Sequence, residues 1–100
     1  MRGMRLLWTL FSAVAALEVH VWSQRGISYD AIREIEAACA PLQTTRITAV
    51  DVRVTRPFRD EYALACSASN TKGVVVSTAF YRGQGLRDTC DRCVSELKVD

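Results

Sequence analysis

The sequence predicts a small two-layer α+β domain, in which a helix packs on an antiparallel sheet of three or four strands. Segments in which apolar and polar residues alternate indicate strands, and apolar residues repeated every three or four positions indicate helices. These segments follow one another in the order β-α-β-β-β-α. Such an order is typical of a sheet that helices cover on one face. Four cysteines in so short a chain further predict that disulfides staple the domain.

The N-terminal residues are typical of a removable leader. Arg2 and Arg5 precede an uncharged, mainly apolar run over residues 6–17, which is the charge pattern of a signal peptide. A helix of this length would span about 18 Å, whereas the hydrocarbon layer of a membrane is roughly 30 Å thick. The run therefore indicates a secretory leader.

Two cleavage sites follow the small-residue rule, one after Ala16 and one after Ser23. Residues 18–22 alternate in the strand period, and cleavage after Ser23 would remove this strand. We therefore expect residues 1–16 to be the signal peptide and residues 17–100 to form a single domain. The alternative is an uncleaved leader that remains as a membrane anchor.

A helix is predicted after this first strand. Ser28 is a suitable N-cap, and Ile32, Ile35 and Cys39 recur at the spacing of one helical face, with charged residues on the other side. A proline within a helical pattern ends the helix. Pro41 therefore places the end of this helix near residue 40.

Three strands and a terminal helix follow. Residues 47–55 alternate between valines and polar residues, which predicts a half-buried strand. Residues 62–68 form the next strand, and residues 69–73 form a turn. The run over residues 74–81 is apolar enough to predict the central strand. From Leu86 onward, apolar residues lie on one face of a short amphipathic helix.

The cysteines are interpreted as structural. An even number in a short chain with a secretory leader predicts a disulfide framework, in which Cys39 and Cys66 reach the terminal helix and several pairings stay open. Cys90 and Cys93 also have the spacing of a thiol-redox motif, but few residues follow them, so structural disulfides are favoured. A zinc site needs two close pairs of ligands, and His20 is the sole histidine. We therefore expect no metal and no cofactor.

Charge gives a local signal only. The leader holds two of the thirteen basic residues, so residues 17–100 carry eleven basic and eleven acidic residues. This neutrality excludes the overall positive field of a dedicated nucleic-acid-binding protein. One segment contains Arg46, Arg53, Arg56 and Arg59 around the single acid Asp51. This segment is a candidate anion-binding patch, and the alternative is an ordinary solvent-exposed face of the sheet.

Several segments resemble the small ribonuclease-like secreted effectors of plant-pathogenic fungi. These segments are residues 21–32, with a Gly-x-x-Tyr entry to the helix, residues 61–66, and residues 73–78, with a Gly-Val-Val strand. The effectors resemble fungal guanyl-preferring ribonucleases reduced to a helix and a sheet. The resemblance implies a ribonuclease-like fold and a role in virulence. The chain departs from the family after Trp22, where an aromatic-x-Cys motif is missing, and in its second C-terminal cysteine, so the family's disulfide pattern is not carried over.

Catalytic residues are not expected. Ribonucleolytic transphosphorylation needs a general base, a general acid and a cation for the phosphate. His20 has no second histidine as a partner. Glu61 and Arg53 could supply a carboxylate and a guanidinium, but an ordinary role as solvent-facing strand residues is favoured. We therefore expect no enzymatic activity.

The sequence as a whole predicts a secreted, effector-type binding protein with a non-catalytic, ribonuclease-like fold. Its contacts with an unidentified protein partner are predicted at Arg53, Arg56, Arg59 and Tyr81, because arginine and tyrosine dominate interface energetics. We expect only weak, salt-sensitive RNA association, and no membrane association after leader cleavage. The alternatives are a secreted ribonuclease, a CxxC thiol oxidoreductase, and a membrane-anchored accessory subunit that retains its N-terminal helix.

Overall fold

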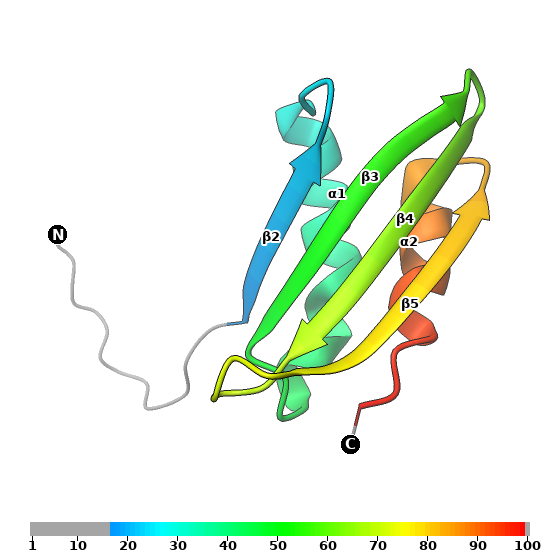
Figure 1. The fold of residues 1–100 in the computed structure, drawn as a ribbon. Helices are drawn as coiled ribbons and strands as arrows, with labels where there is room; N and C mark the ends of the chain where they lie inside the picture. The colour runs from blue at the N-terminus through cyan, green and yellow to red at the C-terminus, as the bar shows by residue number, and fades with distance from the viewer. Residues whose placement is uncertain (1–16, 100) are drawn as a thin grey trace, which may run out of the picture.

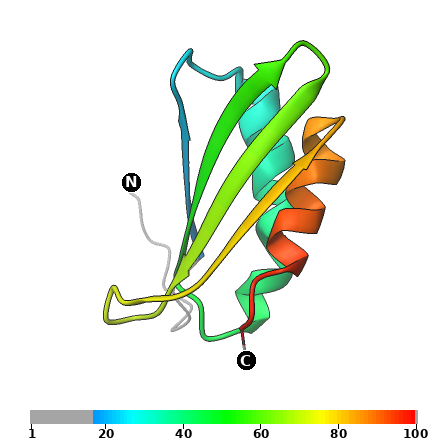
Figure 2. The same cartoon turned by 45° about the vertical axis from the view of Figure 1, so that its right-hand side comes forward.

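Two helices cover one face of a four-stranded sheet in the computed structural model, which describes residues 17–99 (Figure 1). Figure 2 shows both helices on the same side of the sheet, with the other side open. The predicted α+β class and order of elements are confirmed. The strands are β2 (Glu18–Ser23), β3 (Ala49–Phe58), β4 (Glu61–Ser69) and β5 (Val75–Gly83). The helices are α1 (Tyr29–Cys39), the 3-10 helix η2 (Ala40–Thr44) and α2 (Leu86–Ser95).

The predicted leader, residues 1–16, lies outside the described residues. Its cleavage after Ala16 and the start of the domain at residue 17 therefore stay predictions. Within residues 17–99, no helix is long and apolar enough to cross a membrane.

The sheet is mixed rather than purely antiparallel. Its strands lie in the order β2-β3-β4-β5. β3 pairs antiparallel with β4, and β4 pairs antiparallel with β5, whereas β2 runs parallel to β3. Parallel neighbours need a crossover connection instead of a tight turn, and α1 with η2 supplies it. The first strand consequently lies at one edge of the sheet.

The strand β5 lies at the other edge, so the prediction that it is the central strand is wrong. That prediction relied on the run Val74, Val75 and Val76, because continuous apolar runs are typical of strands buried on both faces. These side chains are 54%, 52% and 47% exposed. The central positions belong to β3 and β4, whose inward residues Val52 and Leu64 are fully buried.

The helix α1 begins at the predicted cap. The backbone of Ser28 is extended, and its hydroxyl oxygen accepts a hydrogen bond from the N–H of Ala31 at 3.1 Å. Ile35 and Cys39 are buried in the core, as their helical spacing predicts. The chain then tightens into η2, with Pro41 in its first turn. The start, the buried face and the end of this helix all follow from local sequence.

The helix α2 covers the remainder of the same face. It follows Gly85, whose φ of 82° lies in the left-handed region that favours glycine. The hydroxyl of Thr89 donates a hydrogen bond to the carbonyl of Gly85 at 2.7 Å. Leu86, Cys90 and Cys93 are buried, as predicted. The helix contacts α1, β4 and β5, which completes the core.

The four cysteines are free thiols, so the prediction of a disulfide framework is wrong. Each side chain is at most 1% exposed. Cys39 lies beside Cys90, and Cys66 lies beside Cys93, within reach of thiol hydrogen bonds but not bonded to one another. A thiol behaves as a small apolar group in a packed interior. Burial therefore accounts for these residues without any covalent link.

The position of Leu64 predicts a large loss of stability on truncation. Leu64 is fully buried in the central strand β4, so Leu64→Ala should lower the free energy of unfolding by about 2–5 kcal/mol. The exposed Val76→Ala should change it by only about 0.5 kcal/mol. Urea denaturation followed by circular dichroism measures both. Equal effects of the two substitutions would contradict the described core.

The buried thiols predict low reactivity in the native state. Hydrogen bonding within each pair, together with burial, raises the pKa of Cys66 and of Cys90, whereas the same hydrogen bonds lower the pKa of their partners Cys93 and Cys39. The thiolate is the reactive form, but a reagent must also reach the sulfur, and each of the four cysteines is at most 1% exposed. Ellman's reagent should therefore react slowly with the native protein. After denaturation without reductant, it should react with all four thiols. A smaller number in the denatured protein would reveal a disulfide.

Candidate functional site

A cleft of about 910 Å³ lies between the β2–α1 loop and the β3–β4 hairpin. Both helices begin beside it, because Ser28, the N-cap of α1, and Leu86, the first residue of α2, line its wall. The N-terminus of a helix carries a partial positive charge from its aligned peptide dipoles. The backbone thus contributes positive potential at this end of the domain.

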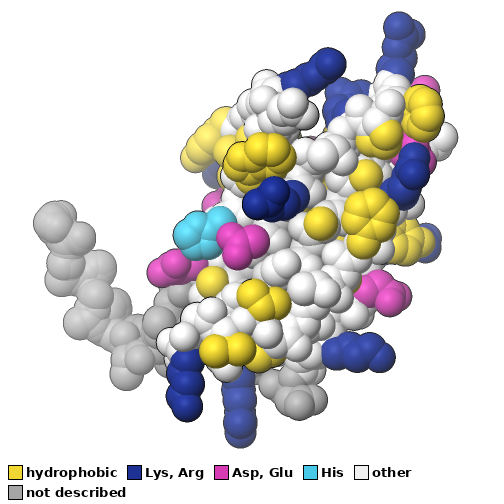
Figure 3. Space-filling model, in the orientation of Figure 1, with side chains coloured by type: hydrophobic (Ala, Val, Ile, Leu, Met, Phe, Trp, Pro, Cys, Tyr) yellow, Lys and Arg dark blue, Asp and Glu magenta, His cyan; other side chains and the backbone are white. Residues whose placement is uncertain are grey.

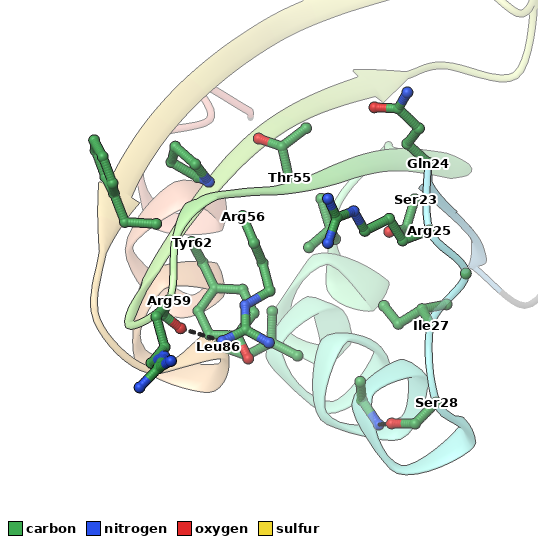
Figure 4. Close-up of a pocket in the computed structure, with 15 residues that line it drawn as sticks. Ser23, Gln24, Arg25, Ile27, Ser28, Thr55, Arg56, Arg59, Tyr62 and Leu86 are labelled. Carbon is green, nitrogen blue, oxygen red and sulfur yellow. Dashed lines mark hydrogen bonds between the residues drawn. The ribbon is translucent and has the colours of Figure 1, made fainter.

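Three arginines line the cleft, namely Arg25, Arg56 and Arg59, and its lining includes no aspartate or glutamate. None of the three forms a salt bridge with another residue of the described part of the chain. Figure 4 shows Arg25 extending from its loop toward the middle of the cleft and Arg56 running down beside Tyr62. The Arg59 side chain points away from the cleft. Arg25 and Arg56 are therefore the inner cationic groups, and Arg59 is peripheral.

The alternation of β3 explains the position of Arg56. Val54 is buried toward the helices, so the next inward position is residue 56, beyond the part of the sheet that the helices cover. Its guanidinium lies 4.9 Å from the centroid of the Tyr62 ring and donates a hydrogen bond to the carbonyl of Arg59. These contacts hold the guanidinium at the cleft wall without neutralising it.

The open face of the sheet carries a second group of exposed side chains. Strand register places Trp22, Arg53, Ala65 and Phe80 in one row across all four strands. The guanidinium of Arg53 lies 5.2 Å from the centroid of the Trp22 ring, within cation–π range. Trp22 is 50% exposed and Phe80 is 61% exposed. The row thus presents aromatic rings at both edges of the sheet.

Acidic side chains occupy a corner of the same face. Glu18 and His20 lie on β2, with His20 Nε2 3.1 Å from Glu18 Oε1. Asp51 is paired in register with His20. Figure 3 shows the histidine and acidic side chains together on the β2 side. The open face therefore has an acidic corner on β2 and β3 and, beside it, the row from Trp22 to Phe80, in which Arg53 is the charged residue.

The predicted contact residues do not share one surface. Arg56 and Arg59 lie at the cleft, whereas Arg53 lies on the open face above Trp22. The hydroxyl of Tyr81 accepts a hydrogen bond from Arg92 on α2 at 3.0 Å, which places Tyr81 on the helix side of β5. Their role in binding stays a prediction.

The residues considered for ribonucleolytic chemistry have separate partners. His20 contacts Glu18, and Glu61 pairs with Arg82 at 2.8 Å. Arg53 contacts the Trp22 ring instead of either acid or base. Within residues 17–99, no group of three or more His, Cys, Asp or Glu side chains could hold a metal ion.

Sequence reasoning missed three exposed residues of these surfaces. Trp22 and Phe80 occupy outward positions in alternating strands, and this pattern could have identified them as exposed aromatics. Arg25 precedes the helix start in a glycine-containing loop. No local signal places it opposite Arg56, because their proximity depends on the pairing of β2 with β3.

No protein-family model matches the chain, and no curated protein matches it in sequence. Among solved structures, it is similar to a ribosomal subunit interface protein from Coxiella burnetii, with a TM-score of 0.64 and 12% identity. The match covers 80% of this chain and 88% of that chain. At this identity the likeness shows the fold alone.

This comparison overturns the resemblance to fungal ribonuclease-like effectors. The predictions of a secreted effector, of virulence and of secretion depended on that resemblance and are wrong with it, because the fold is shared with a ribosomal subunit interface protein. The secreted ribonuclease, thiol oxidoreductase and membrane-anchored alternatives conflict with it too. The motifs behind the resemblance are a glycine turn before a capped helix and a glycine turn before a strand, which many folds contain. The chain instead shares its fold with a ribosomal subunit interface protein.

Proposed function

We propose that this chain is an RNA-binding protein that associates with the ribosome, and that the arginines of the cleft contact RNA phosphates. One observation carries the proposal: three arginines and no carboxylate line a cleft between two loops. The fold neighbour, a ribosomal subunit interface protein, supports the choice of RNA over other polyanions.

The chemistry of the cleft fits a phosphate backbone. A guanidinium presents several N–H donors in one plane and can bind two phosphate oxygens at once. Arg25 and Arg56 reach into the cleft from different segments (Figure 4), so one backbone strand can lie between them. The N-termini of α1 and α2 also lie beside the cleft, but Asp30 and Asp88 in their first turns offset the positive potential of the helix dipoles. The arginines therefore supply most of the positive charge of the cleft.

The distribution of charge supports a local contact surface in a neutral domain. On α2, Arg87 pairs with Asp91 at 3.1 Å and Arg92 pairs with Asp88 at 3.3 Å, so the exposed side of this helix is neutralised. Arg25 and Arg56 have no such partner among the described residues. Other unpaired basic residues are spread over the surface, whereas Arg25, Arg56 and Arg59 line a single cleft that contains no carboxylate.

Removal of the inner arginines should weaken RNA binding. A charge-assisted hydrogen bond contributes about 1.5–3 kcal/mol, so Arg25→Gln and Arg56→Gln should each lower affinity for a ribosomal RNA fragment roughly tenfold or more. Each should also reduce the slope of log affinity against log salt by about one. Fluorescence anisotropy at several salt concentrations measures both quantities.

The matched control is Arg87→Gln, which removes the same charge from a residue paired on α2. This variant should bind RNA about as well as the wild type. If all three variants lose affinity equally, the binding reflects net charge, and the cleft is not the site.

Association with the ribosome has its own test. The wild-type chain should co-sediment with ribosomal particles in a sucrose gradient at low salt and dissociate as salt is raised, because phosphate contacts release counterions. The double variant Arg25→Gln/Arg56→Gln should remain at the top of the gradient. A wild-type chain that stays at the top at every salt concentration would refute the ribosomal part of the proposal.

A further inference from the structure

The open face of the sheet has the geometry of a stacking platform. Trp22 and Phe80 stand at the two ends of one row, with Arg53 and the small Ala65 between them. Three strand intervals of about 4.8 Å separate β2 from β5, so the backbone positions that carry the two rings are roughly 14 Å apart. The small side chain of Ala65 leaves the space in front of the sheet free between them. Flat rings can therefore lie against this row without displacing any packed side chain.

We propose that this face binds an unpaired segment of RNA, whose bases stack on Phe80 and on the Trp22–Arg53 pair. The proposal rests on the proposed function for the identity of the polymer. Aromatic side chains on a four-stranded sheet can stack two or three unpaired bases, and arginine planes stack on bases as well. Double-stranded RNA does not fit, because its bases are already stacked on one another.

Charge favours a polyanion at this row. Arg53 is its charged member, and no carboxylate of the described residues forms a salt bridge with it. Its contact with Trp22 leaves its N–H groups free to meet a phosphate while its plane remains stacked. Along the strands, the row lies between the cleft and the acidic residues Glu18 and Asp51. These carboxylates repel RNA phosphates, so we expect the RNA strand to run from the row toward the cleft.

The row is continuous with the arginine cleft. β2 ends at Ser23, which pairs with Val54, whereas β3 continues to Phe58. The edge of β3 beyond residue 54 is consequently uncovered, and Arg25 follows the end of β2. An RNA strand with phosphates in the cleft can pass around this free edge and reach Arg53 on the open face.

Fluorescence of Trp22 reports on the proposed stack directly. The chain has two tryptophans, Trp8 and Trp22, so Trp8→Phe leaves Trp22 as the single reporter. In this background, a short single-stranded RNA should quench Trp22 fluorescence strongly, whereas a duplex of the same sequence should quench it little. Phe80→Ala should lower the affinity for the single strand about fivefold to a hundredfold, and Phe80→Tyr should restore most of it.

The matched control is Tyr29→Ala, which removes an aromatic ring that is 71% exposed on α1. It should leave the affinity for the single strand unchanged. Phe80 is itself exposed, so Phe80→Ala should keep the wild-type circular dichroism spectrum and melting temperature.

Two results would overturn the proposal. In the first, RNA does not quench Trp22, and Phe80→Ala binds the single strand as well as the wild type, whereas Arg25→Gln/Arg56→Gln does not bind it. This result would leave the proposed function intact. The other is a concentration-dependent dimer of the free protein that Phe80→Ala abolishes, with no quenching by RNA, which would make the open face an interface between protein copies. Failure of the proposed function would give a different result from these two. Neither the wild type nor any variant would then bind single-stranded or double-stranded RNA.

Discussion

The helices bury only one face of the sheet, and the rest of the structure depends on this single-sided packing. Because side chains alternate along a strand, the inward positions of β3 and β4 beneath the helices join the core, whereas the outward positions of β3 from Asp51 to Thr55 remain exposed. Val54 and Leu64 are buried for this reason, while Arg53 and Phe80 are exposed. The same alternation continues past the end of the helices, where Arg56 occupies an inward position without a core to enter. The open face and the cleft therefore have a common origin.

The elements that local sequence determines were predicted well. The hydroxyl of Ser28 caps α1, and the apolar spacing of α2 identified its buried residues. The pairing of strands could not be predicted in the same way, because periodicity shows which side of a strand is buried and not which strand lies beside it. The valine run before and within β5 resembled a central strand, yet it lies at an edge. An even number of cysteines after a leader favours disulfides, although burial alone explains these residues.

Prediction of the candidate site was partial for a related reason. Arg56 and Arg59 stand close together in the sequence, so their grouping was visible as a charge pattern. Arg25 joins them only because β2 runs parallel to β3, which brings the end of β2 toward the end of the hairpin. Trp22 and Phe80 are separated by most of the chain, and only the complete strand order places them in one row. Sites assembled from distant segments need the long-range pairing before they can be recognised.

The exposed valines of β5 have a consequence for the behaviour of the protein in solution. An edge strand presents unpaired backbone N–H and C=O groups, and charged or proline residues usually protect such an edge from pairing with other chains. From Gly73 to Tyr81 this segment contains neither a charge nor a proline, and its first three side chains are about half exposed. Concentrated protein should therefore be prone to edge-to-edge aggregation that starts from the native state. Crowded storage or high expression would expose this weakness before any loss of folding.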